Sequence, residues 1–148
     1  MKSSAPITPD ILLVDESRDG LLVRRALLEE LGYRVHVASN CEEGLKLYKT
    51  TNFDVVVTDH RLPGLNGIDL IVRIRKVNPN ARVVLVSGLT EPLGLTEENT
   101  GADAVIAKNS REAVHLVRAV KRLLNRASSR KPPRSQGKTL VRARTAAR

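Results

Sequence analysis

The segment FDVVVTDHRLPGLNG, residues 53–67, decides the fold of this chain of 148 residues. Its first half is apolar and rich in β-branched side chains, which predicts a central strand over residues 53–58 that is buried on both faces. A proline and two glycines between residues 63 and 67 predict a loop. Apolar side chains then recur at helical spacing over residues 70–77. A strand, a loop and a helix in this order form the repeating unit of a parallel sheet covered by helices.

The same alternation of apolar runs and helical patterns extends over most of the chain. The apolar runs predict five strands, at residues 11–14, 34–38, 53–58, 83–86 and 104–107. Helical periodicity predicts helices at residues 18–31, 40–50, 70–77 and 113–126, with a short or frayed helix at residues 90–100, where Pro92 and Gly94 weaken the pattern. We therefore expect an α/β fold, a doubly wound five-stranded parallel sheet of the flavodoxin-like order 2-1-3-4-5 with helices on both faces.

Two of these helices carry more detailed predictions. In the first helix, Val23, Ala26, Leu27 and Leu31 recur at i, i+3, i+4 and i+8, so we expect this face to pack on the sheet. Before the last helix, residues 109–112 resemble a capping box, because an asparagine stands three positions before a glutamate.

The charge of the chain is divided unevenly along its length. Lysine and arginine outnumber aspartate and glutamate by 25 to 16, which gives a formal net charge of +9. Residues 1–120 hold 15 basic and 16 acidic side chains, whereas residues 121–148 hold 10 basic side chains and no acidic one. We expect a flexible N-terminus at residues 1–8, a folded domain at residues 9–126 and a basic, disordered tail at residues 127–148 that is too short to fold alone.

The composition excludes several classes of protein. No apolar run approaches the roughly 18 residues of a membrane span, and residues 1–10 do not resemble a signal peptide, so we expect a cytoplasmic protein. The one cysteine excludes an internal disulfide and a cysteine zinc site. Two tyrosines and one phenylalanine are too few for the stacking surfaces that readers of single-stranded nucleic acids use.

Polar side chains follow four of the predicted strands at their carboxyl ends, the edge where open parallel sheets bind ligands. Asp15 and Glu16 follow the first strand, Asp59 the third, Ser87 the fourth and Lys108 the fifth. If the first and third strands are neighbours, three carboxylates converge there, which is costly unless a cation or a proton neutralises them. Mg²⁺ suits this position because it prefers oxygen ligands and commonly works with phosphates.

These residue types fit the transfer of a phosphoryl group. Asp59, after the buried central strand, is the candidate nucleophile, because carboxylates form acyl phosphates in covalent mechanisms. Lys108 would supply a fixed positive charge and Ser87 a hydroxyl donor for the phosphoryl oxygens. His60 and Arg61 follow the nucleophile, either as solvent-exposed loop side chains or as groups that overhang the site and tune the access of water.

Four segments at the strand ends together resemble the receiver (phosphoacceptor) domain of two-component response regulators. They are VDES at residues 14–17, TDHRLPGLNG at residues 58–67, SG at residues 87–88 and GADAVIAK at residues 101–108. The resemblance covers about residues 9–126, and its most specific element is the pattern D-x-x-[ML]-P-x-[ML]-[DN]-G.

The resemblance implies roles for individual residues. It implies that Asp59 is phosphorylated by a phosphohistidine on a histidine kinase or a histidine phosphotransfer protein. It implies Mg²⁺ as the cofactor, held by Asp15, Glu16, Asp59 and the main-chain carbonyl of Arg61. It also implies that Ser87 and Lys108 contact the phosphoryl oxygens.

Three positions depart from the usual pattern of that family. Glu16 replaces the more usual aspartate as the second acidic residue, Asn109 replaces the proline that usually follows the lysine, and Val105 replaces an aromatic residue. The departures, together with the weak helix at residues 90–100, predict that the usual signalling readout is altered. They leave open a second hypothesis, a pseudo-receiver that signals through its interactions without phosphorylation.

The sequence therefore predicts a receiver that accepts a phosphoryl group on Asp59, hydrolyses it slowly at most and signals through a downstream protein, rather than an enzyme. Aspartyl phosphatases usually carry a second aspartate two residues after the nucleophile, and Arg61 stands there. The basic tail suggests a third hypothesis, a weak contact with a polyanion such as duplex DNA. The sequence leaves the oligomeric state and the cognate kinase open.

Overall fold

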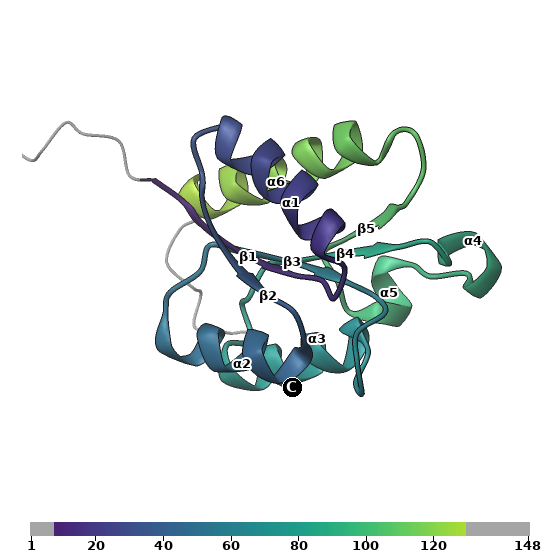
Figure 1. Cartoon of the computed structure of the whole chain (residues 1–148). Helices are drawn as coiled ribbons and strands as arrows, with labels where there is room; N and C mark the ends of the chain where they lie inside the picture. The colour runs from purple at the N-terminus through teal and green to yellow at the C-terminus, as the bar shows by residue number, and fades with distance from the viewer. Residues whose placement is uncertain (1–7, 130–148) are drawn as a thin grey trace, which may run out of the picture.

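The strands of this computed structural model, which describes residues 8–129, form one parallel sheet in the order β2-β1-β3-β4-β5 (Figure 1). The strands are β1 (Asp10–Val14), β2 (Arg34–Ala38), β3 (Val55–Asp59), β4 (Val83–Ser87) and β5 (Ala104–Ala107). The predicted fold class and strand order are confirmed. The third strand begins two residues later than predicted and includes the aspartate at its end, Asp59.

Helices cover both faces of the sheet. The helices are α1 (Arg18–Glu30), α2 (Cys41–Thr50), α3 (Gly67–Val77), α4 (Thr90–Leu93), α5 (Glu97–Thr100) and α6 (Glu112–Ser129). Helices α1 and α6 lie on one face, and α2 and α3 on the other (Figure 1). None of the helices within residues 8–129 is both long enough and apolar enough to cross a membrane. The predicted flexible N-terminus and basic tail lie almost wholly outside the described residues.

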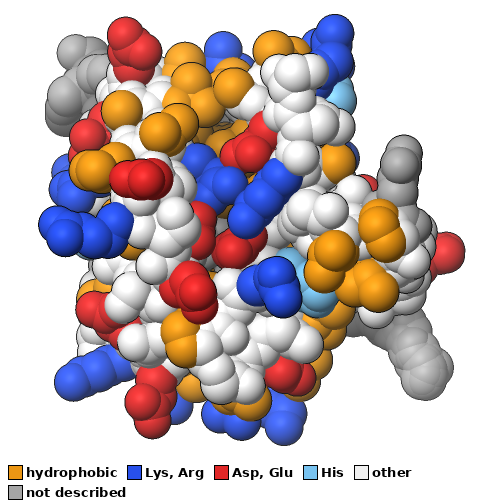
Figure 2. All heavy atoms as spheres, turned by 45° about the vertical axis from the view of Figure 1, so that its right-hand side comes forward, with side chains coloured by type: hydrophobic (Ala, Val, Ile, Leu, Met, Phe, Trp, Pro, Cys, Tyr) orange, Lys and Arg blue, Asp and Glu red, His pale blue; other side chains and the backbone are white. Residues whose placement is uncertain are grey.

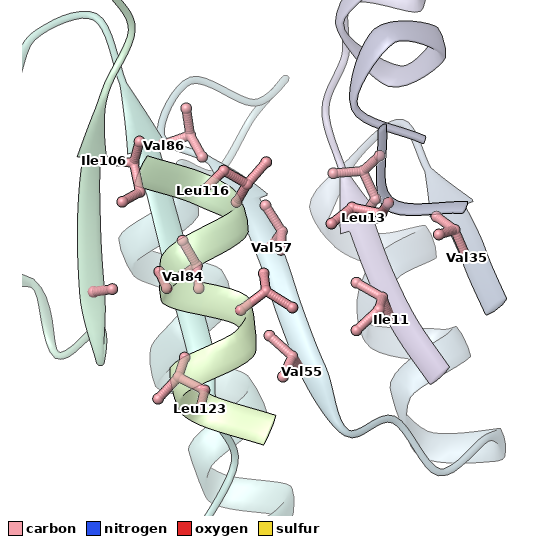
Figure 3. Packing of buried hydrophobic residues seen from close by; sticks show 14 residues of the cluster. Ile11, Leu13, Val35, Val55, Val57, Val84, Val86, Ile106, Leu116 and Leu123 are labelled. Atoms are coloured by element: carbon pink, nitrogen blue, oxygen red, sulfur yellow. The ribbon is translucent and has the colours of Figure 1, made fainter. Parts of the chain in front are cut away.

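Two hydrophobic clusters, one on each face of the sheet, form the core. Alternate residues of a strand point to opposite faces, so Ile11 and Leu13 of β1 join the cluster under α1 and α6, whereas Leu12 and Val14 join the cluster under α2 and α3. Figure 3 shows the first cluster, in which α6 lies over the central strands. Burial on both faces explains why the strands appear in the sequence as continuous apolar runs.

The predicted core face of α1 is confirmed at Leu27, which packs against the cluster under α1 and α6, and is wrong at the other three residues. Val23 is 67% exposed, and Ala26 and Leu31 are exposed as well. The face that packs inward instead contains Arg24 and Leu28. An arginine is buried here because acidic groups surround its guanidinium, a contact that helical periodicity cannot reveal.

The weak helical pattern before β5 becomes two helices of one turn each, α4 and α5, which confirms the prediction of a short helix. Pro92 lies within α4, and Gly94 follows it with a φ of 61°. Thr96 caps α5, and Gly101 ends it in the left-handed conformation. Proline and glycine therefore divide the segment as their backbone preferences require.

Candidate functional site

Backbone hydrogen bonds continue the sheet beyond its strands and hold polar residues at its carboxyl edge. Asp15 N donates to Ala38 O at 3.0 Å, so the residue after β1 stays aligned with β2. Lys108 N donates to Ser87 O at 3.0 Å and fixes the residue after β5 beside β4. Asp59 is the last residue of β3. The sheet thereby brings four of the predicted site residues to one edge.

Figure 2 shows the side of the molecule toward which this edge faces. Acidic and basic side chains gather near the middle of this face, around a depression. Opposite charges in close contact predict that the side chains here pair with one another.

Asp59 is a buried carboxylate with an incomplete set of partners. Its exposed fraction is 5%, and Lys108 Nζ lies 2.7 Å from Asp59 Oδ1. Oδ1 is itself buried, and within the described residues no group other than Lys108 contacts it as a donor. Burial raises the pKa of Asp59, as does the nearby Asp15 carboxylate, while Lys108 lowers it. The net result is a raised pKa, which marks this carboxylate as a candidate reactive group.

Asp15 is more deeply buried than Asp59, with an exposed fraction of 1%, but both of its oxygens have partners. Oδ1 accepts a hydrogen bond of 2.9 Å from Ser17 N, and Oδ2 forms an ion pair with Nη1 of Arg24. Gly20 lies against this pair, because a Cβ atom there would overlap Asp15 Oδ2 and lie 3.0 Å from Arg24 Nη1. The absence of a side chain at Gly20 therefore makes room for the contact.

Arg24 also reaches the first residue of α6. Its Nε donates to Glu112 Oε2 at 2.7 Å. Burial alone would lower the pKa of Arg24, but Glu112 and Asp15 raise it above its ordinary value. The predicted capping box is wrong for this reason: the Glu112 carboxylate binds Arg24, and Asn109 Oδ1 instead accepts from Arg111 N at 2.8 Å.

Ser87 lies in the site but is engaged with a neighbour. Its Oγ lies 3.3 Å from His60 Nδ1 and accepts a hydrogen bond of 2.9 Å from Leu89 N. His60 is buried, so the expectation that it is a solvent-exposed loop side chain is wrong. The Ser87 hydroxyl at the end of β4 and the His60 ring after β3 therefore form a polar contact between neighbouring strands.

The remaining predicted site residues, Glu16 and Arg61, are exposed. Within residues 8–129 no three histidine, cysteine, aspartate or glutamate side chains lie grouped so that they could hold a metal ion. The three predicted carboxylates therefore do not converge as a set, because Glu16 does not join the two buried aspartates. The sequence did predict that Lys108 and Asp59 lie at the same edge of the sheet, and here they form an ion pair.

Comparison with known proteins decides the family. The sequence model of the response regulator receiver domain matches residues 11–121, a range that includes every site residue described above. The chain belongs to the response regulator receiver domain family. Receiver domains are signalling modules of two-component systems rather than classical enzymes.

Relatives of this receiver occur within long sensor proteins and as short chains. It is 40% identical to the virulence sensor protein BvgS of Bordetella bronchiseptica over 73 residues, 49% of this chain and 6% of BvgS. It is 31% identical to the chemotaxis protein CheY of Thermotoga maritima over 100 residues, 66% of this chain and 83% of CheY. The receiver therefore spans a small part of the sensor protein and most of CheY.

A solved structure shares the fold of this receiver. It is the response regulator TrrA from Thermotoga maritima in complex with Mg²⁺-BeF, at a TM-score of 0.71 and 29% identity. The match covers 79% of this chain and 100% of that one.

The donor set of the receiver fits Mg²⁺ at two of the predicted ligands. Asp15 and Asp59 are close enough for the Asp15 charge to raise the pKa of Asp59. All their ligating atoms are oxygens, and the buried Asp59 Oδ1 has Lys108 as its one partner among the described residues. Such atoms are what a hard divalent cation prefers. The guanidinium of Arg24 already neutralises one of the two carboxylates.

Sequence reasoning missed Arg24, Gly20 and Glu112 as members of the site. A signal for Arg24 was present, because Leu21, Arg24 and Leu28 share one helix face by their i, i+3, i+7 spacing. A basic residue on an otherwise apolar stripe indicates a buried partner of opposite charge.

Proposed function

We propose that this receiver accepts a phosphoryl group on Asp59 from a phosphohistidine of a histidine kinase or a histidine phosphotransfer protein. The observation that carries the proposal is the buried Asp59 carboxylate at the end of β3, with Lys108 Nζ 2.7 Å from Oδ1. A nucleophile needs a free lone pair and a nearby positive charge, and Asp59 has both.

The transfer is a displacement at phosphorus. An Asp59 carboxylate oxygen attacks the phosphorus atom, the P–N bond of the phosphohistidine breaks, and its electron pair stays on the imidazole. An acyl phosphate results on Asp59. Lys108 supports the ionised carboxylate before the transfer and would contact a phosphoryl oxygen after it.

Ser87 would supply a hydroxyl donor to another phosphoryl oxygen. In the structure its Oγ lies 3.3 Å from His60 Nδ1, so it would have to leave that ring to reach the phosphoryl group. His60 is thereby a candidate for tuning the site, since it competes for the hydroxyl.

Mg²⁺ would be held by Asp15 and Asp59, with Glu16 and the Arg61 main-chain carbonyl as the further predicted ligands. When bound, Mg²⁺ would neutralise the negative charge of the carboxylates and of the incoming phosphoryl oxygens. The complex of TrrA with Mg²⁺-BeF supports this assignment.

The partners follow from the family. Receiver domains interact with histidine kinases or phosphotransfer domains, and the similarity to part of a sensor protein supports a donor of this kind. We expect a downstream protein target, a cytoplasmic location and slow hydrolysis of the acyl phosphate.

The proposal is tested with a small acyl phosphate donor, acetyl phosphate, and Mg²⁺, followed by mass spectrometry of peptides. One phosphoryl group on Asp59 is expected, and the label should disappear in Asp59→Asn. Asp54→Asn is a matched control, because Asp54 lies just before β3, at its other end, and accepts a hydrogen bond from Asp10 N. Absence of the label from Asp59, or an unchanged label in Asp59→Asn, would contradict the proposal.

A pseudo-receiver is the second candidate, and one observation favours it. The ion pair of Arg24 with Asp15 neutralises a predicted metal ligand from within the chain. A protein of this kind would neither bind Mg²⁺ nor accept the phosphoryl group, and the same labelling experiment distinguishes the two candidates. The polyanion contact through the basic tail, residues 127–148, lies almost wholly outside the described residues and stays a prediction.

A further inference from the structure

Arg24 connects two acidic side chains that lie 97 positions apart in the chain, Asp15 after β1 and Glu112 at the start of α6. Its exposed fraction is 7%. A buried guanidinium is stable only when its charge and its N–H groups are compensated. Nη1 is paired with Asp15 and Nε with Glu112, so each carboxylate compensates one side of the same group.

The two carboxylates differ in their access to solvent. The side chain of Asp15 is 1% exposed, whereas that of Glu112 is 23% exposed. The guanidinium could therefore give up its contact with Asp15 and keep Glu112 as a partner near the surface. The reverse exchange would leave Arg24 wholly in the interior.

Both oxygens of Asp15 already have partners. Oδ1 accepts from Ser17 N, and Oδ2 is paired with Arg24. A divalent cation that binds Asp15 competes directly with the guanidinium, because two positive charges on the same carboxylate repel each other.

We propose that Arg24 is a positioning residue with two states: it pairs with Asp15 and Glu112 when Asp15 and Asp59 hold no metal, and with Glu112 alone when Mg²⁺ binds them. Glu112 is the first residue of α6, so the binding of Mg²⁺ is transmitted to the first turn of that helix. The inference rests on the proposed function, since it assumes that Asp15 serves Mg²⁺.

The test is a calorimetric titration of the full chain with Mg²⁺, without any phosphoryl donor, in two variants that should respond in opposite directions. Arg24→Met keeps the packing of the long side chain but removes the competing cation, so Mg²⁺ should bind about tenfold more tightly. Glu112→Gln keeps the Asp15 pair but removes the charge onto which Arg24 withdraws. Mg²⁺ should then bind several-fold more weakly than to the unmodified protein.

Helix α1 offers a matched pair of controls. Arg25 and Glu29 form an exposed ion pair one turn apart, so Arg25→Met and Glu29→Gln make the same chemical changes at a pair that does not include Asp15 or Asp59. Neither should alter the Mg²⁺ affinity. Equal affinities in all variants, equal losses in Arg24→Met and Glu112→Gln, or no Mg²⁺ binding in any variant would overturn the inference.

The amide resonances of residues 111–115 provide a second readout. They should shift on Mg²⁺ binding in the unmodified protein and stay in place in Glu112→Gln at saturating Mg²⁺. If Arg24→Met fails to fold, these shifts and the Mg²⁺ affinity of Glu112→Gln still test the two-state role of Arg24.

The labelling of Asp59 separates this inference from the proposed function. Opposite shifts in Mg²⁺ affinity without any label on Asp59 would support the role of Arg24 and overturn phosphoryl transfer. A label on Asp59 with unchanged Mg²⁺ affinities would do the reverse.

Discussion

Asp15 and Asp59 are the same residue type at the ends of two neighbouring strands, but the fold treats them differently. Both are buried, yet Asp15 has a separate partner on each oxygen, whereas the contact found for Asp59 within residues 8–129 is the ion pair of its Oδ1 with Lys108. Burial raises the pKa of Asp59. Asp15 is therefore compensated on both oxygens, whereas burial outweighs the compensation that Asp59 receives from Lys108.

The cations that face these two carboxylates differ as well. Arg24 is buried on a helix and paired twice, whereas the Lys108 side chain is 34% exposed and has one ion pair. A lysine is a flexible point charge, and an arginine is a rigid fork that suits paired acceptors. The Asp59 side of the site can therefore rearrange more easily than the Asp15 side.

The largest effect on stability is expected from Arg24→Met. It leaves Asp15 buried without its counter-charge, which should cost about 3 kcal/mol of unfolding free energy. Urea denaturation without Mg²⁺ measures it. Arg25→Met, at an exposed pair, should cost less than about 0.5 kcal/mol, and similar losses in the two variants would contradict the expectation that burial makes the pair of Arg24 with Asp15 costly to break.

The second largest effect on stability is expected at Gly67, which lies against the backbone of Asp59. A Cβ atom at Gly67 would overlap Asp59 O and lie 2.9 Å from Leu85 Cδ1, so Gly67→Ala should destabilise the protein by about 2 kcal/mol. Thermal unfolding is the measurement. Gly88→Ala is the control, because the nearest atom to its Cβ is 4.0 Å away, on the Lys108 side chain; it should be nearly neutral, and equal losses would contradict the account.

The two aspartates should respond to the same substitution with opposite signs. At pH 7, Asp15→Asn should lower the unfolding free energy by about 1–3 kcal/mol, because it weakens a buried charge-assisted pair. Asp59→Asn should raise it, since the pKa of Asp59 is raised by burial and its ionised form disfavours folding.

The pH dependence of the unfolding free energy tests the predicted sign of the Asp59→Asn effect. A carboxyl group whose folded pKa is raised contributes stability that is complete below its unfolded pKa, about 3.9, and is lost as pH rises through the folded pKa. The advantage of Asp59→Asn over the unmodified protein should thus grow from pH 3.5 toward pH 7 in urea titrations. An advantage that shrinks over this range would mean that Lys108 outweighs burial.

The smallest effect on stability is expected from Lys108→Met. The pair with Asp59 is partly exposed on the lysine side, so its loss should change the unfolding free energy by less than about 1 kcal/mol. The pKa of Asp59 should rise further, because Lys108 lowers it. Carboxyl chemical shifts across a pH titration measure this, and an unchanged pKa would show that the ion pair has little influence on Asp59.

Much of the fold could be predicted because its strands are buried on both faces. The valines of β3 and β4 form continuous apolar runs, and the glycine, proline and asparagine between Asp59 and α3 mark the loop that follows. The edge on which Asp59 and Lys108 meet follows from parallel strand order alone. These features depend on local residue preferences and on a topology with few alternatives.

The inward face of α1 and the start of α6 could not be predicted in the same way. The helical pattern favoured Val23 for the core because valine is apolar, while Arg24 belongs to a type that is almost never fully buried unless paired. The pair that buries it comes from another loop and another helix. Glu112 has the right spacing for a capping box, but the nearby guanidinium is the stronger partner for its carboxylate.

The sequence by itself determined the sheet, its order and the set of polar residues at the strand ends, because hydrophobic periodicity and turn residues act over short distances along the chain. Only the tertiary structure decided which of those residues are paired, how many partners each carboxylate has and which cation pairs with each one. These outcomes depend on distances between side chains far apart in the sequence, and on burial, which makes each charge require a specific partner.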